Sequence, residues 1–191
     1  GGRRTSKKKD KALVTLGGKT LLEHAIERLR PQVLRTVIST NSNCDEYRRF
    51  GMPVIKDMTP GFDGPLAGVL AGLNWTDMND MDALVSVAVD TPFFPLDLVA
   101  KLRGENGITL AVADSPSGLH PTFALWPRSV SSVLRDWLSS GESRKMTAFL
   151  KSQSFTKVFF EQTATLDPFF NINTPQDLRI ASAENVGRLA K

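Results

Sequence analysis

The most continuous apolar run in the chain covers residues 83–89, where it is rich in valine and bounded by Asp82 and Asp90. A short unbroken run of this kind is typical of a strand buried on both faces, as in the middle of a parallel sheet. The polarity then changes abruptly at Asp90. Because ligand crevices of open α/β sheets lie beyond the carboxyl ends of the strands, Asp90 either lines a site or caps the turn before Pro92.

Apolar residues recur at helical spacing in residues 20–30, which predicts an amphipathic helix that ends before Pro31. His24 lies on this helix, where we expect a structural role. Further helices are predicted at residues 44–50, 64–75, 96–103, 129–138 and 145–151. The last helix begins after Thr174, a suitable N-cap followed by a proline, with Asp177 in its first turn.

Short apolar runs between these helices predict strands at residues 35–40, 53–56, 83–89, 108–113, 122–125 and 156–160. The connection between residues 108–113 and 122–125 is short, which favours an antiparallel pair at one side of the sheet. Alternating helices and strands elsewhere predict an α/β protein with helices on both sheet faces. We therefore expect one domain over residues 1–191, a three-layer α/β/α Rossmann-like fold with a mostly parallel mixed sheet.

The composition is that of an ordinary globular protein, with 41% hydrophobic and 23% charged residues. No run of about 18 apolar residues is present, so we expect no membrane span. With no signal peptide and a single cysteine, Cys44, we expect a cytoplasmic protein. The chain has two histidines, which favours a hard cation held by carboxylates and phosphates over zinc.

Basic charge is concentrated at the start of the chain. Residues 1–11 carry a net charge of +5 and the whole chain +4, so the remainder is close to neutral. Nucleic-acid binding usually needs a broader basic face, and we expect no nucleic-acid partner. Gly1 and Gly2 before a basic run are typical of a phosphate-binding loop, the alternative being a solvated tail. Because such a loop normally follows a first strand, we expect one upstream of Gly1.

Several motifs occur in the order of one known family: GG before a basic run, DKAL, GGKTLLEHAIERL, VIKD, GPLAG, VDTPF, HPTFAL and NINTPQDL. Together they extend from Gly1 to the last helix, and the chain resembles the molybdenum cofactor guanylyltransferases. The resemblance implies transfer of GMP from GTP to the terminal phosphate of molybdopterin, with release of pyrophosphate and with Mg²⁺. It leaves open whether further partner proteins deliver molybdopterin or take part in the maturation of molybdoenzymes.

The resemblance also implies roles for individual residues. Lys11 and Asp90 would be catalytic, and Asp90 would bind Mg²⁺. The nucleotide site would comprise Gly1, Gly2, Lys11, Asp57, Gly64, Gly68 and Asp90, with Ser39 and Asn41 as alternatives for one polar contact. Asn171 and Asn173 would lie on the pterin side. Arg144 and Lys145, between two predicted helices, are candidates for charge toward the pterin phosphate.

The chemistry fits the residues independently. A phosphate monoester is already anionic near pH 7, so its attack requires charge neutralisation and in-line positioning rather than a general base. The chain departs from the family where Thr5-Ser6-Lys7-Lys8-Lys9 replaces the usual Arg-Met-Gly-Gly, which leaves open whether Arg3 or Arg4 contacts phosphate. Two alternatives remain: a cytidylyltransferase acting on the same pterin, and a non-catalytic nucleotide- and pterin-binding carrier. Cytidylyltransferases typically carry Ala-Gly where this chain has Gly1-Gly2, which favours GTP.

Overall fold

The computed structural model describes residues 10–41, 44–56, 64–105, 107–163 and 165–189. Its helices are α1 (Leu21–Leu29), α2 (Cys44–Arg48), α3 (Pro65–Met78), α4 (Leu98–Arg103), α5 (Val130–Ser139), α6 (Met146–Ser152) and α7 (Pro175–Leu189), with 3-10 turns η1 (Lys11–Leu13) and η2 (Arg30–Gln32). Its strands are β1 (Thr15–Leu16), β2 (Lys19–Thr20), β3 (Ile38–Ser39), β4 (Val54–Ile55), β5 (Ala83–Ser86), β6 (Ala111–Ser115), β7 (Gly118–Pro127) and β8 (Thr156–Phe159). The predicted helices are confirmed, with their ends shifted by a few residues.

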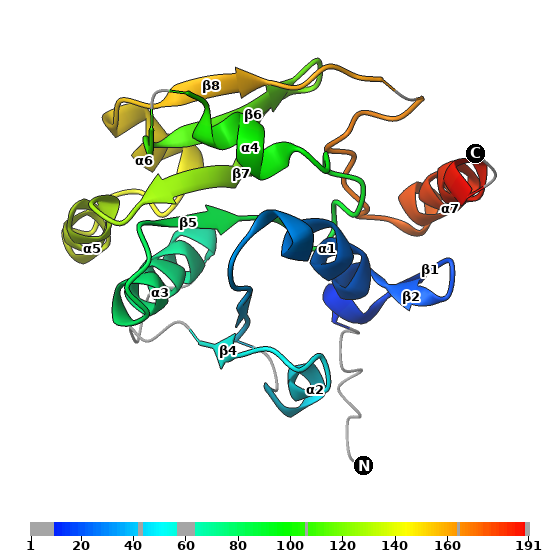
Figure 1. Cartoon of the computed structure of the whole chain (residues 1–191), viewed down its shortest axis with the longest axis horizontal. Helices are drawn as coiled ribbons and strands as arrows, with labels where there is room; N and C mark the ends of the chain where they lie inside the picture. Colours follow the sequence, from blue (N-terminus) through cyan, green and yellow to red (C-terminus); the bar gives the residue numbers. More distant parts are fainter. Residues whose placement is uncertain (1–9, 42–43, 57–63, 106, 164, 190–191) are drawn as a thin grey trace, which may run out of the picture.

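The central sheet has the strand order β5-β7-β6-β8 and mixes both pairing directions (Figure 1). β7 is antiparallel to both β5 and β6, whereas β6 and β8 are parallel. The expected antiparallel pair of residues 108–113 and 122–125 is confirmed as β6 and β7, and β8 covers the outer edge of β6. β3 and β4 form a separate parallel pair, and β1 and β2 form an antiparallel hairpin.

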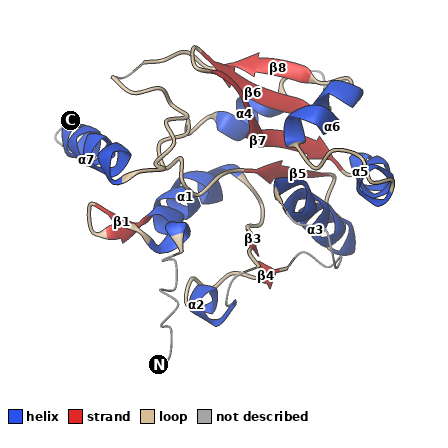
Figure 2. Ribbon diagram, turned by 180° about the vertical axis from the view of Figure 1, so that it is seen from behind, coloured by secondary structure: helices blue, strands red, loops and turns tan. Residues whose placement is uncertain are grey.

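Helices cover both faces of the central sheet, as the three-layer prediction requires (Figures 1 and 2). Alternate residues of β7 belong to the two cores because successive strand side chains point to opposite faces. Phe123 and Leu125 pack in a cluster with residues of α1 and α4. Ala124 and Trp126 pack in a cluster with residues of α3, α5 and α6. None of the described helices has the length and apolar character that a membrane span requires.

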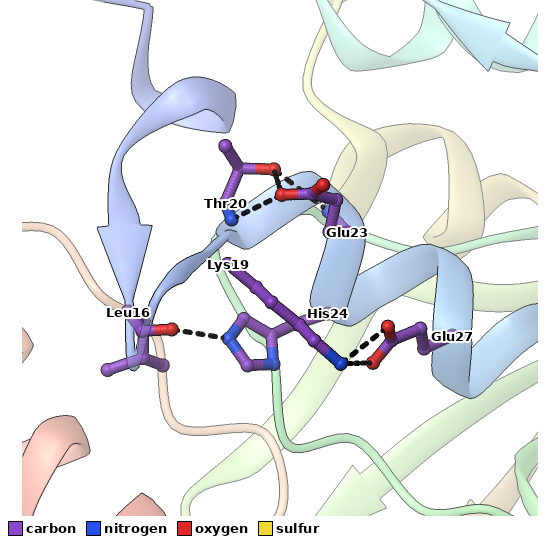
Figure 3. A network of polar contacts seen from close by, with 6 residues as sticks. All are labelled: Leu16, Lys19, Thr20, Glu23, His24 and Glu27. Atoms are coloured by element: carbon purple, nitrogen blue, oxygen red, sulfur yellow. Dashed lines mark hydrogen bonds and ion pairs between the residues drawn. The ribbon is translucent and has the colours of Figure 1, made fainter. Parts of the chain in front are cut away.

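Helix α1 begins with a capping box, which fixes its start beside the β1–β2 hairpin (Figure 3). The Glu23 carboxylate accepts from the Thr20 amide at 2.7 Å, and the Thr20 hydroxyl accepts from the Glu23 amide at 3.2 Å. These two bonds satisfy amides that a helix start otherwise leaves unpaired. His24 Nε2 lies 2.8 Å from the Leu16 carbonyl oxygen, so its contact ties the helix to the hairpin.

The apolar run of residues 83–89 differs from its prediction. Only Ala83–Ser86 forms a strand, its partner β7 is antiparallel, and every residue of β5 is half-buried rather than buried. By contrast β6, which lies in the interior of the sheet between β7 and β8, is buried at Ala111–Ala113. The physical reason is that β5 pairs along one edge only within the described residues, and its other edge faces a cavity.

Candidate active site

Three side chains from distant parts of the sequence meet beyond the carboxyl end of β5. The Lys11 ammonium donates to Asp90 Oδ2 at 2.6 Å and to Asn173 Oδ1 at 2.5 Å. The Lys11 side chain is 38% exposed and that of Asp90 is 22% exposed, so the pair is accessible from solvent. The resulting cluster is one ammonium held between two oxygen acceptors at the edge where an α/β sheet binds its ligands.

The segment that carries Asn173 is tied directly to the Asp90 backbone. The Ile172 amide donates to the Asp90 carbonyl oxygen at 2.8 Å. The Ile172 side chain is buried in a cluster that also contains Phe93. Since both a hydrogen bond and apolar packing join these segments, the positions of Asp90 and Asn173 depend on each other.

A second cap orients the backbone at Asn173. Asp177 Oδ2 accepts from the amides of Asn173 and Thr174 at 2.9 and 2.8 Å, and the Thr174 hydroxyl accepts from the Asp177 amide at 3.1 Å. The amide of Asn173, followed by that of Thr174, holds the pKa of Asp177 below its ordinary value. The predicted start of the last helix is thereby confirmed, and its cap leaves the Asn173 side chain free to reach Lys11.

Lys11 is anchored through its neighbour Asp10. Asp10 Oδ1 accepts from the Ala12 amide at 3.1 Å, which caps η1, and Asp10 Oδ2 accepts from the Tyr47 hydroxyl at 2.5 Å. Burial raises the pKa of Tyr47, and the Asp10 carboxylate raises it further, so the hydroxyl remains a donor at neutral pH. The sequence analysis assigned no role to Tyr47, although it is the only tyrosine in the chain.

The oxygen donors of this cluster suit a hard divalent cation. Among the described residues no group of three or more His, Cys, Asp or Glu side chains could hold a metal by itself. Mg²⁺ is commonly held by one or two carboxylates together with substrate phosphates, and Asp90 supplies such a carboxylate. A cation, the Lys11 ammonium, already lies between Asp90 and Asn173, which shows that positive charge is favoured at this position.

Residues 1–156 match the family model of the MobA-like NTP transferase domain. The chain belongs to the MobA-like NTP transferase family. The molybdenum cofactor guanylyltransferase of Rhizobium meliloti is 42% identical over 191 residues, covering 96% of this chain and 88% of that relative. The molybdopterin-guanine dinucleotide biosynthesis protein A of Archaeoglobus fulgidus is 25% identical with a TM-score of 0.70, covering 94% of this chain and 91% of that one.

A Mycobacterium tuberculosis protein solved in complex with manganese is 13% identical with a TM-score of 0.68, covering 92% of this chain and 93% of that one. At this low sequence identity, the similarity shows only that the two proteins share a fold. The family resemblance drawn from the sequence motifs is confirmed. Asn173 lies beyond residues 1–156, so the MobA-like domain match covers Lys11 and Asp90 but not their third partner.

Some of the other nucleotide-site candidates belong to the described residues of this MobA-like domain, and the rest lie outside them. Gly64 precedes α3 with φ 113°, a conformation that strains any residue with a Cβ. Gly68 and Ser39 line the cavity between β3 and β5. Asn41 is exposed two residues beyond the end of β3, so the choice between Ser39 and Asn41 stays open. Gly1, Gly2 and Asp57 lie outside the described residues.

The structure does not bring Arg144 and Lys145 to the pterin-side asparagines. Lys145 directly precedes α6, whose Met146 packs with α3 and α5 in one core cluster. Ile172, between Asn171 and Asn173, packs in a different cluster beside the β1–β2 hairpin. Figures 1 and 2 show α6 at the opposite end of the molecule from α7. The expectation that both segments form one pterin surface is therefore corrected.

A second polar cluster lies at the ends of β6 and β7. The buried Ser115 hydroxyl donates to Asp167 Oδ2 at 2.7 Å and lies 2.8 Å from His120 Nε2. Since the single hydroxyl proton is given to Asp167, the histidine nitrogen is assigned as the donor to Ser115. Ser115 is therefore not activated by His120, and the cluster is not a hydrolase triad.

This second cluster fixes the start of the segment that leads to Asn173. His120 stacks on Phe169 with ring centroids 4.4 Å apart, and the Phe169 amide donates to Asp167 Oδ1 at 2.8 Å. Burial lowers the pKa of His120 below its ordinary value. Burial also acts to raise the pKa of Asp167, but hydrogen bonds from Ser115 and the Phe169 amide outweigh it, and this pKa is lowered. A neutral histidine and an ionised aspartate follow at pH 7.

Proposed function

We propose that this chain transfers GMP from GTP to the terminal phosphate of molybdopterin and releases pyrophosphate. The main support for this proposal is the contact between Lys11 and Asp90 beyond the end of β5. A relative that is 42% identical to this chain is named a molybdenum cofactor guanylyltransferase. In this reaction an oxygen of the molybdopterin phosphate forms a bond to the α-phosphorus of GTP. The bond from that phosphorus to the bridging oxygen breaks, and its electron pair leaves with pyrophosphate.

Lys11 would bind the triphosphate. Its ammonium lies on a flexible four-carbon stem, so it can leave Asp90 and Asn173 for phosphate oxygens without a change in the backbone. The contacts that it would make are charge-assisted hydrogen bonds, which are about twice as strong as neutral ones. Gly1, Gly2, Gly64, Gly68 and Asp57, with Ser39 or Asn41, remain the proposed residues around the nucleotide.

Asp90 is the proposed ligand of Mg²⁺, which when bound neutralises charge on the phosphate oxygens. Departure of the Lys11 ammonium toward a phosphate would expose the Asp90 carboxylate to that second cation. The side-chain amide of Asn173 would then lose its contact with Lys11 and could bind a ligand beside the nucleotide. Because an amide both donates and accepts, Asn171 and Asn173 are suited to the mixed hydrogen-bonding edge of a pterin.

The test is release of pyrophosphate from GTP or CTP in the presence of molybdopterin and Mg²⁺. We expect turnover with GTP to exceed turnover with CTP by at least an order of magnitude. Faster turnover with CTP would assign the chain to the cytidylyltransferases. Binding of GTP without pyrophosphate release would support the carrier. A cytoplasmic location, and partners that deliver molybdopterin or receive the product, stay predictions.

A further inference from the structure

The HPTFAL motif contains a histidine, His120, to which the proposed function gives no role. His120 lies near the start of β7 and contacts Ser115, the last residue of β6. β5 and β6 both run antiparallel to β7, and β8 runs parallel to β6, so the carboxyl ends of β5, β6 and β8 lie at one edge of the sheet. The second polar cluster, which comprises Ser115, His120 and Asp167, therefore shares this edge with Asp90.

The segment between β8 and α7 carries Asn173 to this edge without regular secondary structure of its own. None of its described residues belongs to a helix or strand (Figure 1). At its start the Phe160 amide donates to the Asp114 carbonyl oxygen at 2.8 Å. Near its end the Ile172 amide donates to the Asp90 carbonyl oxygen at 2.8 Å. The position of the residues between these two bonds depends on turns and side-chain contacts.

Asp167 attaches the middle of this segment to the sheet. Its Oδ2 atom accepts from the buried Ser115 hydroxyl at 2.7 Å, and its Oδ1 atom accepts from the Phe169 amide at 2.8 Å. The Phe170 amide donates to the Asp167 carbonyl oxygen at 3.0 Å, which closes a turn. One carboxylate thus joins a side chain of β6 to the backbone of the segment.

His120 contacts both ends of this connection. Its Nε2 atom lies 2.8 Å from Ser115 Oγ, and its ring stacks on Phe169 with centroids 4.4 Å apart. Without the histidine donor, the described contacts would leave the Ser115 oxygen to accept only from Ser117, whose amide lies 3.2 Å away. Without the ring, Phe169 would lose a stacking partner. His120 therefore fixes the serine and the phenylalanine relative to each other.

Apolar packing links the position of this turn to that of Asn173. Leu166 and Phe170, which flank the turn, pack against the cluster that contains the buried Ile172. Asn173 follows Ile172 directly. A shift of the turn would therefore displace Asn173 and its contact with Lys11.

We propose that His120 is a positioning residue for the acceptor substrate, acting through Ser115 and Asp167 on the segment that carries Asn173. The identity of that acceptor, molybdopterin, rests on the proposed function. None of the described contacts of His120 involves Lys11, so binding of the nucleotide should not depend on this histidine. A histidine that only stabilises the fold would instead impair the use of both substrates alike.

The first test compares the KM for each substrate in pyrophosphate release at saturating Mg²⁺. His120→Phe keeps an aromatic ring beside Phe169 but removes the donor to Ser115, whereas His120→Gln keeps an amide donor. We expect His120→Phe to raise the KM for molybdopterin about three- to tenfold, the effect of one lost hydrogen bond, and to leave the KM for GTP unchanged within about twofold. His120→Gln should recover part of this loss.

Ser86→Ala is the matched control for a loss of stability. The Ser86 hydroxyl donates to the Thr122 carbonyl oxygen at 2.9 Å and accepts from the Trp126 indole at 2.8 Å, so it also links two strands of the sheet. Its removal should lower the thermal midpoint while the two KM values keep their ratio. A selective increase in the KM for molybdopterin in Ser86→Ala as well would overturn the proposal.

A double variant, His120→Phe with Asn173→Ala, tests whether the effect passes through the asparagine. If it does, His120→Phe should raise the KM for molybdopterin by less than about a further twofold in a chain that already lacks Asn173. Full additivity of the two substitutions would overturn the proposal. Equal increases in both KM values for His120→Phe alone would do the same.

Amide hydrogen exchange provides a measurement that does not use turnover. His120→Phe should speed exchange at the Phe169 and Ile172 amides at least about fivefold, because both are hydrogen-bonded within the segment, and Ser86→Ala should leave them unchanged. Unchanged exchange at both amides in His120→Phe would overturn the proposal. A parent chain that releases no pyrophosphate would refute the proposed function instead, and exchange would still decide whether His120 holds the segment.

Discussion

Replacement of Lys11 by alanine tests whether this lysine acts on the triphosphate or only stabilises the fold. In the structure its ammonium contacts Asp90 at 2.6 Å, with side chains 38% and 22% exposed. Ion pairs exposed to this degree contribute about 0–1 kcal/mol to the free energy of unfolding. The thermal midpoint should therefore fall by no more than about 4 °C.

The expected loss of activity is larger than this loss of stability. A hydrogen bond from a charged group is worth about 1.5–3 kcal/mol, which corresponds to a roughly 10- to 150-fold decrease in kcat/KM at 1.4 kcal/mol per factor of ten. The assay is pyrophosphate release from GTP with molybdopterin at saturating Mg²⁺. Stability and rate are measured on the same preparation, so a folding defect is detected directly.

Lys19 provides a matched control within the same chain. It forms an ion pair with Glu27 at 2.7 Å, with side chains 51% and 53% exposed, and lies in the β1–β2 hairpin (Figure 3). Lys19→Ala removes an ammonium and an ion pair of similar length but no proposed phosphate contact. Equal rate losses for Lys11→Ala and Lys19→Ala, or an unchanged rate for Lys11→Ala, would refute the assignment of Lys11 to the triphosphate.

The remaining predictions concern the groups around Lys11 and the second polar cluster. Asp90→Asn should nearly abolish pyrophosphate release while the thermal midpoint stays close to that of the parent, and a normal rate at saturating Mg²⁺ would remove Asp90 from the site. Asn173→Ala should raise the KM for molybdopterin more than that for GTP, whereas equal increases would limit its role to the contact with Lys11. Tyr47→Phe removes the donor to Asp10 and should lower the free energy of unfolding by about 1–2 kcal/mol in urea titrations, an effect that a dispensable hydroxyl would not produce. Because burial lowers the pKa of His120, the unfolded chain binds its proton first as the pH falls below about 6.5, so stability should decrease from pH 7 to pH 5. His120→Gln should flatten that decrease, and an identical pH dependence in both proteins would contradict it.

Local signals in the sequence were sufficient for much of the fold. Helix α1 could be predicted because its apolar spacing and its capping residues, Thr20 and Glu23, all lie within one short segment of the sequence. The start of α7 follows in the same way from Thr174 and Asp177. The meeting of Lys11 with Asp90 could be anticipated because family motifs and the carboxyl end of a strand point to one edge of the sheet.

The errors arise where structure depends on a neighbour distant in sequence. The burial of β5 depends on which strands flank it, and its apolar sequence does not reveal that one of its edges has no strand partner among the described residues. The contact of Tyr47 with Asp10 joins residues that no spacing rule connects. Arg144 and Lys145 were assigned by their charge, but charge does not reveal that α6 packs at the opposite end of the molecule from α7 (Figure 1).

The three side chains at the end of β5 are each held by a separate backbone device. Asp10 caps the turn that carries Lys11, the Ile172 amide binds the Asp90 carbonyl oxygen, and Asp177 caps the backbone beside Asn173. Because these devices act on the backbone, movement of the Lys11 ammonium from Asp90 to a phosphate breaks none of them. The cost of that movement is limited to two exposed or half-exposed hydrogen bonds, which phosphate contacts can replace. Backbone anchoring with a flexible lysine side chain thus permits the proposed exchange, in which Lys11 neutralises Asp90 before the nucleotide binds and the triphosphate afterwards.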